Sequence, residues 1–225
     1  MAKIKTTISA NRERALLLYD RLIQEYPDAE CSLDHVKPLE LVVATILSAQ
    51  CTDARVNMIS PALFARFPTA DDYANASLKE IEKYIKTCGF YHNKAKNIRN
   101  MARALIERHD GEVPNTLEEL TALDGVGRKT ANVVLGAIFK IPGVVVDTHV
   151  KRLAFRLGWT EQTQPPKIEK ELMERMPQSE WIFGAHALIL HGRRVCKARK
   201  PACGDCPMLA WCPRNGLQPL EEDDS

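Results

Sequence analysis

The sequence of 225 residues contains no apolar run near the ~18 residues that cross a bilayer, so we expect no membrane-spanning helix. It shows no internal repeat and no low-complexity segment, which excludes solenoid and fibrous proteins. Glycine (11 residues) and proline (13 residues) are too scarce for a collagen-like or disordered chain. No apolar stretch follows Lys3 and Lys5, so we expect no secretory signal and a cytoplasmic protein.

The chain also lacks a strong charge of either sign, because its formal net charge is only +2. Four acidic residues, Glu221, Glu222, Asp223 and Asp224, lie together near the C-terminus, so the rest of the chain carries a net charge of +6. A moderately basic body is compatible with binding to nucleic acid. It is equally compatible with a solvated surface of mixed charge.

Signals for β-strands are almost absent. Only Val144–Val146 has an extended pattern, and three residues cannot build a sheet. Apolar residues recur instead at helical spacing, with capping boxes at Ser77–Glu80 and Thr116–Glu119 and a kink expected at Pro61. The expected helices cover 9–26, 38–50, 53–67, 77–88, 93–108, a short segment from 116, 127–140, 147–157, 165–176 and 179–195. The sequence therefore predicts an all-α protein of about ten helices.

The first segment with chemical meaning runs from Leu123 to Ala131, with the sequence Leu-Asp-Gly-Val-Gly-Arg-Lys-Thr-Ala. Its two glycines, Gly125 and Gly127, allow a tight turn between two helices. The N–H groups of the turn and of the following helix N-terminus then form an anion site that fits a DNA phosphate. An ordinary turn between antiparallel helices explains the glycines as well.

Two residues could carry a reaction. Lys129 falls in the first turn of a predicted helix, where the helix dipole disfavours an ammonium group and should lower the pKa toward that of an amine nucleophile. Asp147 falls at a helix N-cap, where a carboxylate is favoured. Taken alone, Lys129 is equally explained by phosphate binding or solvation, and Asp147 by helix capping.

The seven cysteines are unevenly distributed, and four of them lie close together as Cys196-x6-Cys203-x2-Cys206-x5-Cys212. A reducing compartment argues against structural disulfides, so this group predicts a metal site. Four thiolates on a short loop suit either tetrahedral Zn²⁺ or a 4Fe–4S cluster. The spacing alone leaves these two possibilities open.

Taken together, these segments resemble the endonuclease III family of DNA glycosylases. The string Leu-x-Gly-Val-Gly-x-Lys-Thr-Ala is similar to the family's helix–hairpin–helix, which here spans about 116–140. Residues 47–53 (Leu-Ser-Ala-Gln-Cys-Thr-Asp) resemble its lesion loop, residues 89–95 its DNA-wedging loop, and residues 146–152 its catalytic aspartate segment. The cysteine spacing also matches, so the resemblance covers roughly residues 10–213.

The resemblance implies roles for individual residues. Lys129 becomes the nucleophile and Asp147 the catalytic aspartate, while Gln50 fills the space of a flipped base and Phe90 wedges the base stack. Phe90 stands where the family often has leucine, and on its own it reads as an ordinary core aromatic. The implied DNA contacts are Gln50, Phe90, Gly125, Val126, Gly127, Thr130 and His149. The implied cluster ligands are Cys196, Cys203, Cys206 and Cys212, which favours 4Fe–4S over zinc.

The implied activity is that of a bifunctional DNA glycosylase and AP lyase in base excision repair. It would remove oxidised or ring-saturated pyrimidines from damaged double-stranded DNA by attack of lysine on C1′ and would cut the strand 3′ to the abasic site by β-elimination. The implied fold has two helical domains: a six-helix domain over 31–141, and a cluster domain formed by 1–30 with 142–225. The active site would lie between the two domains. The cluster loop would span 196–212, and 214–225 would form a disordered acidic tail. The protein is expected to be a monomer.

Two other functions fit parts of the sequence. An adenine DNA glycosylase shares the fold and the cysteine pattern but usually lacks the lysine that is present here as Lys129. A non-catalytic helix–hairpin–helix DNA-binding module would need neither Lys129 nor Asp147. The presence of both residues favours the bifunctional enzyme.

Overall fold

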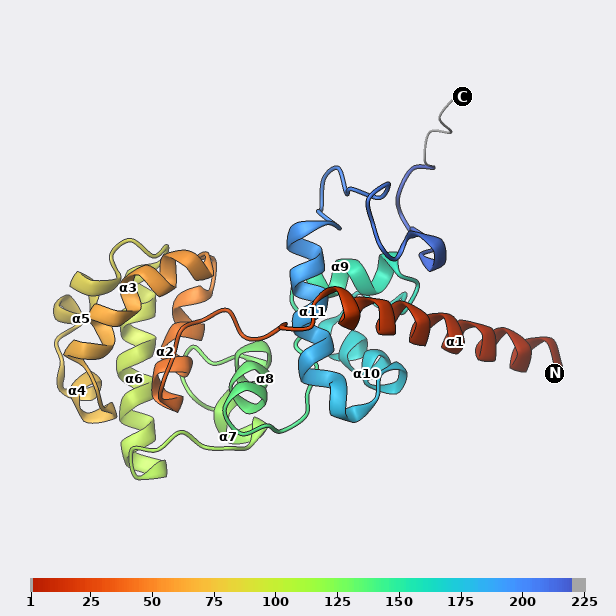
Figure 1. Ribbon diagram of the computed structural model, residues 1–225. Helices are drawn as coiled ribbons and strands as arrows, with labels where there is room; N and C mark the ends of the chain where they lie inside the picture. The colour runs from red at the N-terminus through yellow and green to blue at the C-terminus, as the bar shows by residue number, and fades with distance from the viewer. Residues whose placement is uncertain (1, 220–225) are drawn as a thin grey trace. The chain divides into compact units, whose positions relative to one another are not determined.

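The protein is helical throughout the part that the structure describes, residues 2–219, with side chains from residue 13 onward. This computed structural model contains eleven α-helices and two 3₁₀ helices in that range, and no strand (Figure 1). They are α1 (Ala2–Glu25), α2 (Pro38–Ser48), α3 (Asp53–Arg66), α4 (Ala70–Asn75), α5 (Leu78–Ile85), α6 (Tyr91–His109), α7 (Leu117–Thr121), α8 (Arg128–Ala137), α9 (Thr148–Arg156), α10 (Pro165–Arg175), η1 (Gln178–Glu180), α11 (Trp181–Arg194) and η2 (Leu209–Trp211). The all-α prediction is confirmed. No helix among these residues is both long and apolar enough to cross a membrane.

The chain divides into two compact units. One is continuous and comprises residues 31–141, and we call it the contiguous unit. The other combines the residues up to 30 with those from 142 onward, and we call it the two-segment unit.

The contiguous unit is built around α2 and α6. Every residue of α2 from Leu41 to Leu47 is buried, as the unbroken apolar pattern of that segment predicts. Helix α6 packs against α2, α4 and α5 and buries one face with apolar residues at helical spacing. Because α8 also packs on α2, the helix that carries Lys129 is fixed to this core.

The two-segment unit packs α1 and α9 against α11. Gly184 of α11 allows α1 to approach closely, since a Cβ at that position would lie 2.7 Å from the Tyr19 ring. The Tyr19 hydroxyl donates a hydrogen bond to Glu180 at 3.1 Å. Helix α1 therefore meets α11 at Gly184 and η1 at Glu180, although these segments are far from α1 in the sequence.

Several boundaries differ from the sequence predictions. The helix α4 was not predicted, although Thr69 and Asp72 form a reciprocal capping box at its start. The two predicted boxes are only half formed: Ser77 accepts the Glu80 N–H and Thr116 accepts the Glu119 N–H, without the return bond. The Glu80 carboxylate pairs with Arg66 instead. Helix α3 continues through Pro61 without interruption.

The prediction of a disordered tail from residue 214 is wrong for residues 214–219. The Asn215 N–H donates to the Arg156 carbonyl at 3.2 Å, and the Leu217 N–H donates to the Arg214 carbonyl at 3.0 Å. Gly216 adopts a φ of +74° and lies against the Phe155 ring, which a Cβ would approach to 3.0 Å. These residues are thus ordered against the end of α9. Residues 220–225, which hold the acidic run, lie outside the described part.

Candidate functional site

The turn between α7 and α8 has the conformation that its first glycine permits. Gly125 adopts a φ of +79°, and a Cβ there would lie 3.0 Å from the Cβ and Nδ2 atoms of Asn97 on α6. The next residue back, Asp124, accepts a hydrogen bond from Asn100 Nδ2 at 2.8 Å. The aspartate therefore ties the exposed turn to α6.

Val126, a predicted DNA contact, has both its side chain and its amide engaged within the protein. The side chain is buried in the core of the contiguous unit. The backbone N–H donates to the Leu123 carbonyl at 3.1 Å and closes the turn. Val126 thus anchors the turn from the inside.

Gly127 is the N-cap of α8, and nothing within the described chain strictly requires a glycine there. Its φ of −88° is open to any residue, and a Cβ would meet no atom within 4 Å. A helix N-cap prefers glycine only modestly. The open space beside this N-terminus therefore leaves room for an external group to approach the backbone.

Lys129 and Thr130 occupy the first turn of α8, directly after Gly127. The Lys129 side chain is exposed and that of Thr130 is half-buried. The prediction that Lys129 begins a helix next to the glycine turn is thus confirmed. The amine is positioned by a helix that packs on the core rather than by a flexible loop.

Asp147 caps α9, as the sequence predicts. Its Oδ1 atom accepts hydrogen bonds from the backbone N–H groups of His149 and Val150, both at 2.8 Å. Within residues 2–219 its Oδ2 atom has no hydrogen-bond partner. The helix cap fixes the orientation of a half-buried carboxylate and leaves one oxygen available.

His149, a predicted DNA contact, is half-buried and already engaged. The Arg152 guanidinium donates to its Nδ1 atom at 3.1 Å, and the ring lies against Gly192 of α11, where a Cβ would come within 3.0 Å of Nδ1. Arg152 also donates to the carbonyl groups of Gly192 and Cys196. This network connects the Asp147 cap to the start of the cysteine loop.

Gln50 and Phe90 are both exposed, in two loops of the contiguous unit. Each adopts a left-handed backbone conformation, with φ values of +55° and +59°. Such a conformation costs ~1–3 kcal/mol for a residue other than glycine and is concentrated at functional sites. The Phe90 side chain is 63% exposed, so the alternative of an ordinary core aromatic is excluded.

The two loops lie next to each other. A Cβ on Gly89 would be 3.7 Å from the Gln50 carbonyl oxygen. Beneath them, the buried Lys94 side chain of α6 donates a hydrogen bond from Nζ to the Leu47 carbonyl oxygen at 2.7 Å. Burial lowers the pKa of this amine. The role of Lys94 could not be recognised from the sequence, since a lysine on an amphipathic helix usually faces solvent.

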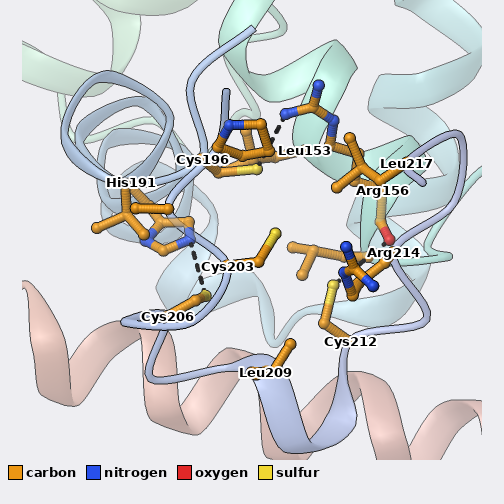
Figure 2. A pocket seen from close by; sticks show the side chains of 14 residues that line it. Leu153, Arg156, His191, Cys196, Cys203, Cys206, Leu209, Cys212, Arg214 and Leu217 are labelled. Carbon is orange, nitrogen blue, oxygen red and sulfur yellow. Dashed lines mark hydrogen bonds between the residues drawn. The ribbon is translucent and has the colours of Figure 1, made fainter. Parts of the chain in front are cut away.

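The four clustered cysteines of the two-segment unit line one pocket (Figure 2). Cys196 follows α11 and Cys212 follows η2, while Cys203 and Cys206 share the turn between them. The rest of the lining includes apolar Leu153, Val195, Leu209 and Leu217. No three Cys, His, Asp or Glu side chains among residues 2–219 converge on a single ion position. Four thiols that line one pocket provide the donor set that a 4Fe–4S cluster requires.

Polar groups from outside the loop reach the sulfur atoms. Arg156 is buried and donates to Cys196 Sγ at 3.4 Å and to the Lys197 carbonyl at 2.7 Å. Burial raises the pKa of the Cys206 and Cys212 thiols. The sequence analysis did not anticipate Arg156, because it comes from α9, 40 residues before the first cysteine.

His191 is buried and lines the same pocket as the cysteines. Its Nε2 atom is 3.7 Å from Cys206 Sγ, and its Nδ1 atom is 2.9 Å from the Tyr26 hydroxyl. Burial lowers its pKa to about 4, so the ring is neutral at neutral pH and carries one N–H. With a thiolate at Cys206, the favoured arrangement has Nε2–H donating to sulfur and Tyr26 donating to Nδ1.

Comparisons with known proteins agree with this geometry. The sequence model of HhH-GPD superfamily base excision DNA repair proteins matches residues 43–178, and the iron–sulfur binding domain of endonuclease III matches residues 196–212. The endonuclease III of Synechocystis sp. is 50% identical over 214 residues, 95% of this chain and 98% of its own. That of Escherichia coli is 40% identical over 202 residues, 90% of this chain and 96% of its own.

Solved structures are also similar to this one. A trapped endonuclease III–DNA covalent intermediate, an estranged-adenine complex, aligns with a TM-score of 0.87 at 43% identity, covering 90% of this chain and 96% of that one. A thermostable thymine-DNA glycosylase aligns with a TM-score of 0.84 at 21% identity over 91% of this chain and 98% of that one, which shows the same fold.

Proposed function

This chain belongs to the endonuclease III family of base excision repair enzymes, which are DNA glycosylases and AP lyases, and from that membership we propose that it removes oxidised or ring-saturated pyrimidines, with Lys129 as nucleophile and Asp147 as the catalytic carboxylate. The observation that carries the proposal is the position of Lys129. Its amine emerges from a helix anchored on the core, directly after a backbone turn open to a DNA phosphate.

The reaction begins with the damaged nucleotide outside the base stack, because the glycosidic bond is inaccessible inside the duplex. The Lys129 amine attacks C1′ of the sugar, the C1′–N bond breaks, and the base leaves with the bonding electrons. The Oδ2 atom of Asp147 is available to stabilise the positive charge that develops on the sugar and to accept the proton that the amine loses. The Oδ1 atom keeps the carboxylate oriented through the helix cap.

Strand cleavage uses the same lysine. Opening of the sugar ring leaves an imine between Lys129 Nζ and C1′. Loss of a proton from C2′ then expels the 3′ phosphate by β-elimination, and water releases the lysine. The solved covalent intermediate of a 43% identical endonuclease III supports a covalent step of this kind.

DNA positioning falls to the backbone around Gly127 and to basic residues near the cysteines. The open space at Gly127 allows a phosphate to reach the N-terminus of α8, where the helix dipole favours an anion. Arg194, Lys197, Arg199 and Lys200 are exposed on and after the end of α11 and would meet phosphates along the duplex. One chain contains all of these groups, so we expect a monomer that acts on chromosomal DNA in the cytoplasm.

The resident cofactor is a 4Fe–4S cluster in the loop 196–212, where we propose Cys196, Cys203, Cys206 and Cys212 as its four ligands. When bound, the cluster supplies structural cross-linking of the loop and takes no part in the sugar chemistry. Arg156 and His191 donate hydrogen bonds to the sulfur atoms, which stabilises their thiolate form.

Metal analysis provides the first prediction. Protein purified without oxygen exposure should be yellow-brown and contain about four irons per chain, as a 4Fe–4S cluster on four thiolates requires. Cys203→Ser should lower thermal stability and solubility more than it lowers the rate of strand cleavage at an abasic site. Stoichiometric zinc in a colourless preparation would contradict this assignment.

The proposed activity can be tested by borohydride trapping on three duplexes that differ in one nucleotide. We expect covalent trapping and strand cleavage with a single thymine glycol, and neither product with an undamaged duplex. A duplex with adenine opposite 8-oxoguanine distinguishes the alternative, since an adenine glycosylase would release adenine from it. Excision of adenine but not of thymine glycol would overturn the proposal, and DNA binding without either excision would favour a non-catalytic module.

The two turn glycines provide a matched prediction. Gly125→Ala should destabilise the protein by about 1–3 kcal/mol. The alanine must adopt the left-handed φ of this position, and its Cβ crowds the Asn97 side chain. Gly127→Ala should leave the melting temperature nearly unchanged but weaken DNA binding, because the added methyl group occupies the space of the phosphate. Thermal melting and fluorescence anisotropy with a labelled duplex measure both effects. Equal DNA affinity of Gly127→Ala and wild type would place the phosphate elsewhere.

A further inference from the structure

Cys51 and Cys88 meet in the contiguous unit although 37 positions separate them. Their Sγ atoms are 3.5 Å apart, and neither forms a disulfide in this structure. Each follows the end of a helix and is held by a backbone bond to it. The Cys51 N–H donates to the Ser48 carbonyl at the end of α2, and the Cys88 N–H donates to the Ile85 carbonyl at the end of α5. The two thiols therefore face each other from two anchored turns.

The pair lies directly between the loops proposed to open the base stack. Gln50 is the residue before Cys51, and Phe90 is the second residue after Cys88. Both neighbours have a left-handed φ, and Gly89 approaches the Gln50 carbonyl. A covalent bond between the thiols would thus fix the spacing of the two loops.

The two sulfur atoms differ in their access to solvent. Cys51 is half-buried, whereas Cys88 is only 1% exposed. Burial and the hydrogen bond with Cys51 raise the pKa of the Cys88 thiol to about 11, and the nearby Lys94 amine acts in the opposite direction. An oxidant from solution therefore reaches Cys51 first, and Cys88 is placed to complete the reaction.

We propose that Cys51 and Cys88 are a reversible disulfide pair, oxidised by a low-molecular-weight disulfide, whose cross-link slows base excision by fixing the two DNA-contacting loops. The Cys51 thiolate attacks the small disulfide, forms a mixed disulfide and releases one small thiolate. The Cys88 thiolate then attacks the Cys51 sulfur atom and releases the second. In total, two protein thiols lose two protons and two electrons, and the small disulfide is reduced to two thiols.

The expected effect follows from geometry. A disulfide bond is ~2.05 Å long, so the two sulfur atoms must approach each other by more than an ångström from their present separation. The cross-link would hold the two loops at one spacing, so they could no longer adjust around an extruded nucleotide. This part of the inference rests on the proposed function, whereas formation of the cross-link does not.

The experiment uses the purified protein with its cluster, incubated anaerobically with oxidised glutathione. Non-reducing peptide mass spectrometry should find the peptides of Cys51 and Cys88 joined, with the loss of two hydrogen atoms. Cys31→Ser, in the same unit, should still form the cross-link, whereas Cys51→Ala and Cys88→Ser should not. Circular dichroism and the visible absorbance of the cluster verify that each protein remains intact.

Activity is then measured on the same samples. The oxidised protein should excise thymine glycol about tenfold more slowly, a change of about 1.4 kcal/mol, and should recover with dithiothreitol. Cleavage at a preformed abasic site should change much less, and Cys51→Ala should be insensitive to the oxidant.

Free thiols at both positions after oxidation, or glutathione that remains on Cys51 alone, would show that Cys51 and Cys88 do not form a disulfide pair. A complete cross-link with an unchanged excision rate would show that the disulfide does not slow base excision through the loops. If the reduced wild type does not excise thymine glycol at all, the proposed function fails, while the peptide mapping still decides the chemistry of the pair.

Discussion

Replacing Lys129 with alanine is expected to abolish borohydride trapping and to reduce strand cleavage by at least about a thousandfold, or about 4 kcal/mol in activation free energy. No other group replaces the amine that forms the covalent bond to C1′. Lys129 is exposed in the first turn of α8, so its removal leaves no cavity and should leave the melting temperature nearly unchanged. The variant should still bind the damaged duplex, which gel-shift titration measures alongside the trapping assay.

Two control variants separate the nucleophile from a phosphate-binding lysine. Lys129→Arg keeps the positive charge and the phosphate contact but cannot form an imine, so it should bind DNA well and fail to trap. Lys79→Ala, an exposed lysine of α5 in the same unit, should trap like wild type. Trapping by Lys129→Ala at the wild-type rate would show that another amine is the nucleophile and that the mechanism above is wrong.

Removing Phe90 or Gln50 is expected to impair excision of an intact lesion about tenfold to a hundredfold, because extruding a nucleotide costs a few kcal/mol that these side chains offset. The Phe90 ring can replace the lost stacking, and the Gln50 amide can form hydrogen bonds to the base left unpaired opposite the extruded nucleotide. Phe90→Ala and Gln50→Ala should keep most of their strand cleavage at a preformed abasic site, where no base must be extruded. The measured quantity is the ratio of the two rates within each variant.

Met58→Ala is the matched control for the loss of an exposed apolar side chain. Met58 lies on α3 in the same unit and is 68% exposed, close to the 63% of Phe90. Its replacement should leave the ratio of excision to cleavage unchanged. Equal loss of both activities in a folded Phe90→Ala protein would mean that these loops do not serve extrusion.

Local sequence signals were enough to predict most of the helices and the backbone positions of two residues of the proposed site. Gly125, with its positive φ, and Asp147, at an N-cap, occupy the conformations that their residue types favour. Such features depend on a few neighbouring residues, so the sequence displays them directly. The same argument fails for Val126, whose neighbours indicate an exposed turn while the tertiary fold buries its side chain.

Contacts between distant segments could not be predicted in this way. The hydrogen bonds from Arg156 and His191 to the cysteines join different elements, and no local pattern distinguishes these residues from ordinary core or surface positions. The pairing of Cys51 with Cys88 likewise depends on how α2 and α5 end beside each other. The helix α4 was missed because six residues are too few to show a helical period.

The two-segment unit has a consequence for the order of events during synthesis. Helix α1 leaves the ribosome before its packing partner α11, and the whole of residues 31–141 lies between them. At ~5–20 residues per second, α1 waits on the order of ten seconds with its apolar face uncovered. The contiguous unit can fold on its own during that interval, since its contacts are all encoded within one stretch. Nascent α1 is therefore the segment that a chaperone would be expected to protect.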